Sequence, residues 1–254
     1  MTFKSNTIII TGGGRGIGRG ISQAFLEAGA NIIICGRRAV DDLSSNAHFI
    51  ALDIRENDAG IKLRDFALEK TGRIDVLINN AGGGPPVASK DASPNLTQKV
   101  VALNLLAPIN LSQALYAPLK ENSGSIINIS SVSATRSSPG SVAYGAAKAG
   151  LLNVTTSLAM EWAPDIRVNA IIAGLVKTEA SQAHYGGAKG MAYLSDNLPM
   201  KRMGSPQDIA KACLFLANPD NSYISGACLE VFGGGEPPSF LKITQEAHKF
   251  NEKS

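Results

Sequence analysis

The stretch TGGGRGIG, from Thr11 to Gly18, decides how the rest of the chain is interpreted. It follows a β-branched apolar run at residues 7–10 and precedes an amphipathic stretch at residues 17–28. A glycine-rich turn lets backbone amides approach an anion at a helix N-terminus, where unpaired N–H groups and the helix dipole favour negative charge. Such a run is a weak indication alone, but its position between a strand and a helix is the context that a dinucleotide-binding motif requires.

The same alternation of apolar runs and amphipathic stretches continues along the chain. Apolar strands joined by helices indicate a parallel sheet covered on both faces, and right-handed crossovers make it doubly wound. The sequence therefore predicts an α/β fold, a single doubly wound Rossmann-type domain over residues 1–254, with a parallel seven-stranded sheet and helices on both faces. The predicted strands are residues 7–10, 31–34, 48–52, 74–78, 125–129, 167–172 and 227–232; the predicted helices are 17–28, 55–71, 93–120, 142–162 and 206–217, with at most a short helix at 40–45.

Two segments lie outside this alternation. Residues 176–205 lack clear periodicity, and a stretch of that length in a compact domain is usually a lid or binding loop, so a substrate lid is predicted there. For the C-terminal tail, residues 236–254, three alternatives stay open: cover over a neighbouring subunit, cover over the substrate mouth, or disorder.

Composition narrows the class of protein. Hydrophobic residues make up 44% and charged residues 18%, which suits a globular core. No apolar run approaches the ~20 residues of a membrane-spanning helix, and the N-terminus has no apolar segment of a secretory signal. The net charge is +3 without a long Lys/Arg cluster, so nucleic-acid binding has little support. Scattered cysteines fit a cytoplasmic location, and isolated histidines give no metal-ligand spacing. The residues concerned are Cys35, Cys213, Cys228, His48, His184 and His248.

The end of the second predicted strand bears on which nicotinamide cofactor is bound. In a dinucleotide fold this strand end meets the adenine ribose, where an acid binds the 2′-hydroxyl and an arginine accommodates a 2′-phosphate. Gly36 stands where the acid is expected, Arg37 follows it, and Arg15 in the glycine loop can reach the same phosphate. One exposed arginine would ordinarily be a solvated surface side chain. Two at one predicted place, without the acid, favour NADP(H) over NAD(H).

The candidate acid/base centre is Tyr144-Gly-Ala-Ala-Lys148, near the start of a predicted helix. A spacing of four places both side chains on one helix face. A free tyrosine has a pKa of ~10, and an adjacent ammonium is expected to lower it. Ser131 ends the fifth predicted strand, where open α/β sheets bind ligands, with Ser130 as the neighbouring candidate. Asn104 lies inside a predicted helix, an unfavourable position for asparagine.

These motifs in this order, with Asn79-Asn80-Ala81-Gly82 after the fourth predicted strand, resemble the classical short-chain dehydrogenase/reductase family, which includes 3-oxoacyl-(acyl-carrier-protein) reductases. The resemblance runs from Thr7 to about Gly235 and implies a homotetramer. It implies that Tyr144 exchanges a proton with the substrate, Ser131 holds the reacting oxygen, Lys148 also binds the nicotinamide ribose, and Asn104 supports a water-linked relay. The implied cofactor-binding residues are Gly12, Arg15, Gly16, Ile17, Gly18, Arg37, Asp53, Ile54, Asn80, Ala81, Gly82, Tyr144, Lys148, Gly174 and Thr178.

The chain departs from the family's pattern at Ala173, where a proline is usual, and at Phe232, where an acid is usual. The implied activity is hydride transfer between NADP(H) and a carbonyl or secondary alcohol, with a 3-oxoacyl thioester, a steroid-like ring ketone or a small hydrophobic ketone as the substrate. Apolar lid residues would suit such a ligand or simply pack the loop: Ala183, Met191, Tyr193, Leu194 and Met203. The alternative function is a non-catalytic nucleotide-sensing or interaction protein on the same fold.

Overall fold

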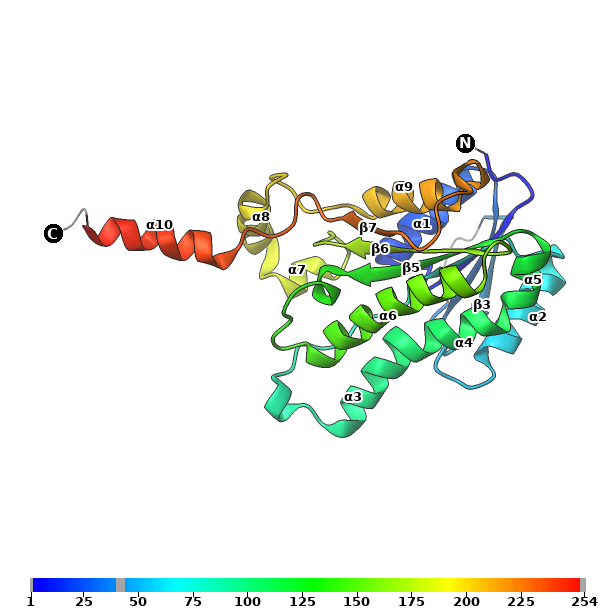
Figure 1. The fold of residues 1–254 in the computed structure, drawn as a ribbon, viewed down its shortest axis with the longest axis horizontal. Helices are drawn as coiled ribbons and strands as arrows, with labels where there is room; N and C mark the ends of the chain where they lie inside the picture. Colours follow the sequence, from blue (N-terminus) through cyan, green and yellow to red (C-terminus); the bar gives the residue numbers. More distant parts are fainter. Residues whose placement is uncertain (1, 40–43, 252–254) are drawn as a thin grey trace.

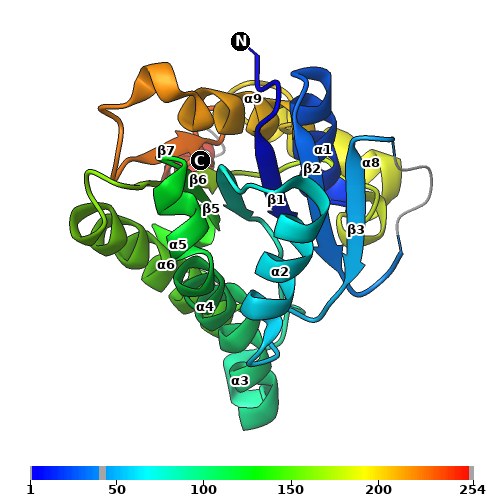
Figure 2. The same cartoon turned by 90° about the vertical axis from the view of Figure 1, so that its right-hand side faces the viewer.

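The computed structural model describes residues 2–39 and 44–251 and contains one sheet of seven parallel strands, in the order β3-β2-β1-β4-β5-β6-β7 (Figures 1 and 2). The order reverses between β1 and β4, and it is at such a reversal that open α/β sheets bind ligands, in the crevice outside the carboxyl ends of the strands. The doubly wound prediction is confirmed. The strands are β1 (Thr7–Thr11), β2 (Asn31–Gly36), β3 (Ala47–Ala51), β4 (Val76–Asn79), β5 (Ser125–Ser131), β6 (Arg167–Ala173) and β7 (Cys228–Val231).

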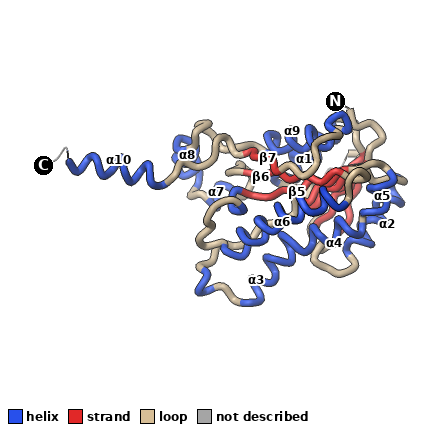
Figure 3. Tube along the Cα trace, viewed as in Figure 1, coloured by secondary structure: helices blue, strands red, loops and turns tan. Residues whose placement is uncertain are grey.

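Helices cover both faces of the sheet, as Figure 3 shows. Successive side chains of a strand point to opposite faces, so Ile8 and Ile10 pack with α1 and α9 whereas Ile9 packs with α2 and α4. Complete burial of such a side chain stabilises the fold by roughly 1.5–3 kcal/mol. The helices of the two layers are α1 (Gly16–Glu27) and α9 (Pro206–Ala217) on one face, and α2 (Ala59–Thr71), α4 (Ala107–Ala114), α5 (Tyr116–Glu121) and α6 (Val142–Glu161) on the other.

The long helix predicted at residues 93–120 is interrupted. It comprises α3 (Pro94–Val101), the π-helical segment η2 (Ala102–Leu106), α4 and α5. Pro108 has no N–H to donate to the carbonyl of Asn104 four residues earlier, so regular α-helical bonding cannot continue there. Single π turns inside helices are frequent at functional sites.

Three other predicted segments differ in detail. The helix expected from residue 55 begins at Ala59, because the chain turns first, with the Glu56 N–H donating to the carbonyl of Asp53 (3.0 Å). In the predicted lid, two helices occur, α7 (Ser181–His184) and α8 (Gly187–Asn197). The tail forms α10 (Ser239–Asn251), which extends away from the sheet (Figure 1). Residues 40–43 of the short helix expected at 40–45 lie outside the described residues, and Ser44 and Ser45 are not helical.

Short 3-10 turns complete the chain at η1 (Ser89–Asp91), η3 (Val132–Ala134) and η4 (Pro219–Asn221). Within residues 2–39 and 44–251 no helix is both long and apolar enough to cross a membrane. The same part of the chain holds no group of three acidic, histidine or cysteine side chains placed to bind a metal ion. Cys35 and Cys213 are buried in the two core layers, and burial raises the pKa of both thiols.

Candidate active site

The glycine loop is shaped by close backbone contacts at the end of β1. Gly12 has a positive φ of 67°, and its N–H donates to the carbonyl of Cys35 at the end of β2 (2.8 Å). A Cβ on Gly18 would lie 2.2 Å from the carbonyl oxygen of Gly12, so only glycine fits there. Arg15 and Arg37 therefore follow neighbouring strand ends, and both side chains are exposed.

The first backbone amide of α1 already holds an anion. The N–H of Gly16 donates to Oε2 of Glu179 (3.0 Å), and α1 has no acidic residue in its first turn. The preceding residue, Arg15, makes no side-chain cap. An amide at a helix N-terminus that binds a carboxylate can also bind a phosphate oxygen. The loop therefore fits the pyrophosphate of a dinucleotide.

The turn after β4 is fastened to the end of β1. The N–H groups of Asn80 and Ala81 both donate to Oγ1 of Thr11 (2.9 Å each), and the Asn80 amide donates to the Thr11 carbonyl (2.8 Å). Asn79 points to the interior and donates to Oδ1 of Asn128 on β5 (2.9 Å). Thr11 is absent from the predicted site residues, although it is the residue that joins the two strand ends.

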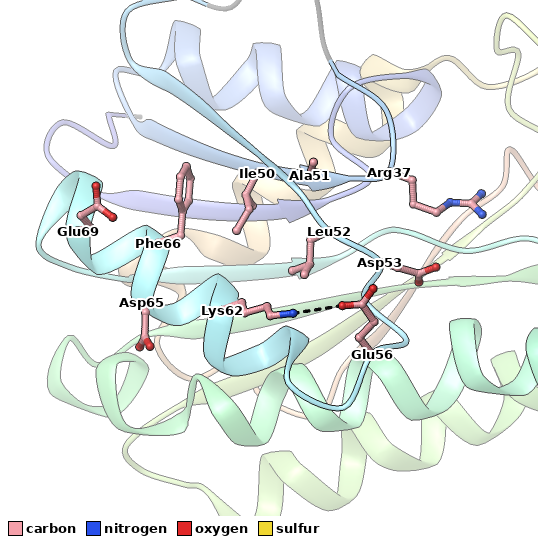
Figure 4. Close-up of a pocket in the computed structure, with 10 residues that line it drawn as sticks. All are labelled: Arg37, Ile50, Ala51, Leu52, Asp53, Glu56, Lys62, Asp65, Phe66 and Glu69. Atoms are coloured by element: carbon pink, nitrogen blue, oxygen red, sulfur yellow. Dashed lines mark hydrogen bonds and ion pairs between the residues drawn. The ribbon is translucent and has the colours of Figure 1, made fainter.

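Arg37, which follows β2, and Asp53, which follows β3, lie close together. They stand at one end of a cavity of about 770 Å³ beside β3 and α2, with Phe66 and Glu69 at the opposite end (Figure 4). Arg55 donates three hydrogen bonds to Asp53, from its backbone N–H (3.1 Å) and Nε (2.9 Å) to Oδ1 and from Nη2 to Oδ2. These bonds, with a smaller contribution from Arg37, lower the pKa of Asp53 to about 2. Arg55 is not among the site residues predicted from the sequence.

Ile17 and Ile54, two of the predicted cofactor-binding residues, face the interior. Ile54 is buried in the core on the α2 side, and Ile17 is half-buried against the core on the α1 side. Any contact of Ile54 with a dinucleotide therefore falls to its backbone, whereas the side chain of Ile17 is still partly accessible.

Tyr144 and Lys148 share one face of α6, near the end of β5. The Lys148 ammonium lies 5.9 Å from the centre of the Tyr144 ring and donates to the carbonyl of Ile129 (2.8 Å). Ser131 lies beside Tyr144, close enough for the two side chains to interact. Ser130 instead donates to the backbone carbonyl of Lys148 (3.0 Å), so of the two serines it is Ser131 that the structure brings to Tyr144.

The electrostatics of this pair differ from the prediction. Burial raises the pKa of Tyr144, and the hydrogen bond from Ser131 offsets only part of that rise. Burial also lowers the pKa of Lys148 to about 8. The expected lowering of the Tyr144 pKa by an adjacent ammonium is therefore wrong for this structure, because desolvation dominates over the distant charge.

Asn104 lies in η2 and connects the helix to the turn after β4. Its side chain is fully buried; Oδ1 accepts from the N–H of Gly83 (2.8 Å), and Nδ2 donates to the carbonyls of Gly83 (2.9 Å) and Val100 (2.8 Å). A Cβ on Gly82 would lie 2.7 Å from Oδ1 of Asn104 and 3.1 Å from the Lys148 ammonium. Glycine at 82 is thus what lets these two side chains approach each other.

The departures from the family's pattern are visible after β6. Ala173 is buried at the end of the strand, and a Cβ on Gly174 would lie 2.6 Å from Cβ of Phe232. Phe232 therefore packs where only glycine leaves room. Thr178 follows in a tight turn in which its N–H donates to Oγ of Ser181 (2.8 Å).

The five apolar lid residues differ in burial. Met191 and Met203 are buried with Leu198 in a small cluster, Leu194 is half-buried, and Ala183 and Tyr193 are exposed. Between α7 and α8, Tyr185 is half-buried, and burial together with the nearby Glu236 and Tyr144 raises its pKa. The lid thus reaches toward Tyr144.

The fold and this site together define an oxidoreductase of the dinucleotide-binding class. A family profile described as "Enoyl-(Acyl carrier protein) reductase" matches residues 12–235. The chain is 38% identical to the 3-oxoacyl-(acyl-carrier-protein) reductase of Chlamydia muridarum, over 89% of this chain and 95% of that protein. The chain belongs to the short-chain dehydrogenase/reductase family.

Solved structures agree with this assignment. The structure described as ElxO with NADP bound superimposes with a TM-score of 0.84 at 29% identity, covering 90% of this chain and 98% of that chain. The 3-ketoacyl-(acyl-carrier-protein) reductase of Brucella melitensis, complexed with NADH, gives a TM-score of 0.82 at 30% identity, covering 91% and 98%.

Proposed function

We propose that this protein is an NADP(H)-dependent oxidoreductase that transfers a hydride between the nicotinamide and a carbonyl or secondary alcohol, with Tyr144 as general acid/base. The observation that carries the proposal is the half-buried Tyr144, which has Ser131 beside it at the end of β5 and shares its helix face with Lys148. A positioned hydroxyl within reach of a reacting oxygen is the geometry that acid/base catalysis requires.

In the reducing direction, the bound cofactor supplies the hydride to the carbonyl carbon. The Tyr144 hydroxyl donates its proton to the carbonyl oxygen, and Ser131 hydrogen-bonds to the same oxygen as its charge develops. Lys148, on the same helix face as Tyr144, binds the nicotinamide ribose, and Asn104 supports the water-linked path by which the proton of Tyr144 is restored. Oxidation of the alcohol reverses each step.

The preference for NADP(H) is proposed from the adenine end of the crevice. Arg37 lies near Asp53, Gly36 leaves that strand end without an acid, and Arg15 follows the neighbouring strand end. Among the similar structures, one is described with NADP and another with NADH. The residues of this chain are therefore stronger support for NADP(H) than the cofactors named for the similar structures.

The remaining parts of the proposal concern substrate, lid and assembly. A 3-oxoacyl thioester is the substrate of first choice because a relative 38% identical is named for that reaction, with ring ketones and small hydrophobic ketones next. We assign residues 176–205 as the substrate lid and residues 236–254 as a tail appended to one domain. We propose that the protein is cytoplasmic and homotetrameric, as the family commonly is.

The test is a fluorescence titration with NADPH and with NADH, followed by turnover at 340 nm on 3-oxoacyl thioesters and ketones. We expect tighter NADPH binding, and we expect Tyr144→Phe to retain cofactor affinity while losing roughly 10²–10⁴-fold in turnover. Tyr223→Phe, at a fully exposed tyrosine outside the lid and the candidate site, is the matched control. Tighter NADH binding would overturn the cofactor assignment. Cofactor binding without turnover on any carbonyl would favour the nucleotide-sensing alternative.

A further inference from the structure

We propose that Glu179 is a built-in competitor for the cofactor's pyrophosphate and thereby sets cofactor affinity. Its carboxylate lies on the Gly16 amide (3.0 Å), the first amide of α1. The inference rests on the proposed function, because it concerns the dinucleotide that this loop would hold.

Hydrogen bonds hold the backbone both before and after Glu179. On one side, Val176 forms a parallel bridge with Gly204, and the Lys177 N–H donates to the Gly204 carbonyl (2.8 Å). On the other side, the buried Ser181 accepts from the N–H of Thr178 through its hydroxyl, and its own N–H donates back to the Thr178 carbonyl (3.0 Å). This turn holds the carboxylate in front of the glycine loop.

Thr178 and Glu179 also fill the space beside Gly16 in the glycine loop. A Cβ on Gly16 would lie 3.3 Å from Cγ2 of Thr178 and 3.8 Å from Oε2 of Glu179. Residues 178 and 179 thus cover the amide at the point where a phosphate oxygen would approach. One N–H donates one good hydrogen bond, and two anions at one helix terminus repel each other. The carboxylate and a phosphate oxygen therefore cannot both hold this amide.

Two consequences follow for binding. Without nucleotide, Glu179 pairs the amide and ties the start of the predicted lid to the glycine loop, across 163 residues of sequence. Nucleotide binding has to displace this contact, which lowers the apparent affinity by the population of the released state. Because both NADPH and NADH carry a pyrophosphate, the penalty applies equally to both and leaves their ratio unchanged.

The experiment compares cofactor affinity with loop protection. Glu179→Gln and Glu179→Ala should lower the Kd for NADPH and for NADH by the same factor, roughly two- to fivefold, the effect expected of one charge at a helix N-terminus. In nucleotide-free protein, Glu179→Ala should speed amide hydrogen exchange in residues 12–18. Asp196→Asn removes an exposed carboxylate of α8 and should change neither the Kd of the two cofactors nor hydrogen exchange in residues 12–18.

An unchanged or raised Kd in the Glu179 variants would overturn the proposal. A lowered Kd with unchanged exchange in residues 12–18 would also overturn it, because the effect would then be long-range repulsion without a contact. If the wild type bound neither cofactor, the proposed function would fall, and the exchange measurement would still decide whether Glu179 protects the loop.

Discussion

The two ends of the proposed cofactor site differ in what shifts the pKa of their ionisable groups. At the proposed adenine end, Arg37, Asp53 and Arg55 are partly or largely exposed, and ion pairing shifts the pKa of Asp53 downward. At the proposed nicotinamide end, Lys148 is buried and Tyr144 half-buried, and desolvation drives the pKa shifts that oppose ionisation of both. Exposed pairs are weakened by salt, whereas buried groups are screened much less. Cofactor choice is thus expected to depend on ionic strength, and acid/base chemistry on packing.

The largest expected effect of this contrast is on stability, at Lys148. Its folded-state pKa of about 8 lies below the ordinary 10.5, so between these pH values the unfolded state binds more protons. Stability should therefore rise with pH across that window, and below pH 8 the buried charge carries its full cost. Lys148→Met should remove a penalty of about 1–3 kcal/mol at pH 7 while abolishing turnover.

Urea unfolding at pH 7, 8, 9 and 10 measures this difference. The difference in free energy of unfolding between Lys148→Met and the wild type should become smaller as the pH rises, and added salt should leave that difference unchanged. Lys189→Met, at an exposed position in α8, should have the same free energy of unfolding as the wild type. A Lys148→Met protein less stable than the wild type at pH 7 would contradict burial as the cause of the shift.

The next effect is on cofactor choice, at Arg37. Loss of a charged hydrogen bond to the 2′-phosphate should weaken NADPH binding roughly tenfold in Arg37→Ala. NADH binding should change little, and the wild-type preference for NADPH should shrink as salt is raised. Titration of both cofactors at low and high salt measures this. Arg38→Ala, the adjacent exposed arginine, is the control. An equal loss in both variants would show that general positive charge, rather than Arg37, attracts the phosphate.

The sequence predicts most of the strands and the glycine loop. Apolar runs, glycine spacing and the four-residue spacing of Tyr144 and Lys148 are local signals, so the positions of Gly12, Tyr144 and Lys148 follow from them. The interruption at Asn104 could also be suspected, because Pro108 lies four residues later. Elsewhere local signals fail. Gly187 and Gly190 weaken the helical pattern of α8, so its helix is not apparent from periodicity.

The contact between the lid turn and the glycine loop could not be predicted. No periodicity relates Glu179 to Gly16, because their contact depends on how the lid turn is anchored after folding. The direction of the pKa shift of Tyr144 could not be predicted for the same reason. The spacing to Lys148 is readable from the sequence, but the burial that outweighs it depends on packing by several elements.

The smallest effect concerns Arg55, which pairs with Asp53 but is not among the residues lining the cavity beside Arg37. If Asp53 accepts a hydrogen bond from the adenine amino group, Arg55 fixes the carboxylate for that task. Arg55→Ala should then weaken NADPH and NADH alike, roughly two- to fivefold, as expected of a partly exposed ion pair. Binding of the 1,N6-etheno analogue of NADPH, which lacks the amino hydrogens, should change less.

A fluorescence titration with NADPH, NADH and the etheno analogue distinguishes positioning of Asp53 by Arg55 from a general effect of the arginine charge. Arg64→Ala removes an arginine from the exposed Arg64–Asp65 pair on α2 and should leave all three affinities unchanged. An equal loss for NADPH and its etheno analogue would show that Arg55 acts on the loop rather than on the adenine contact. A selective loss would instead place an orienting ion pair, with no direct ligand contact, at the exposed end of the crevice. At the buried end that orienting role falls to neutral groups, because Ser131 and the Ile129 carbonyl hold Tyr144 and Lys148.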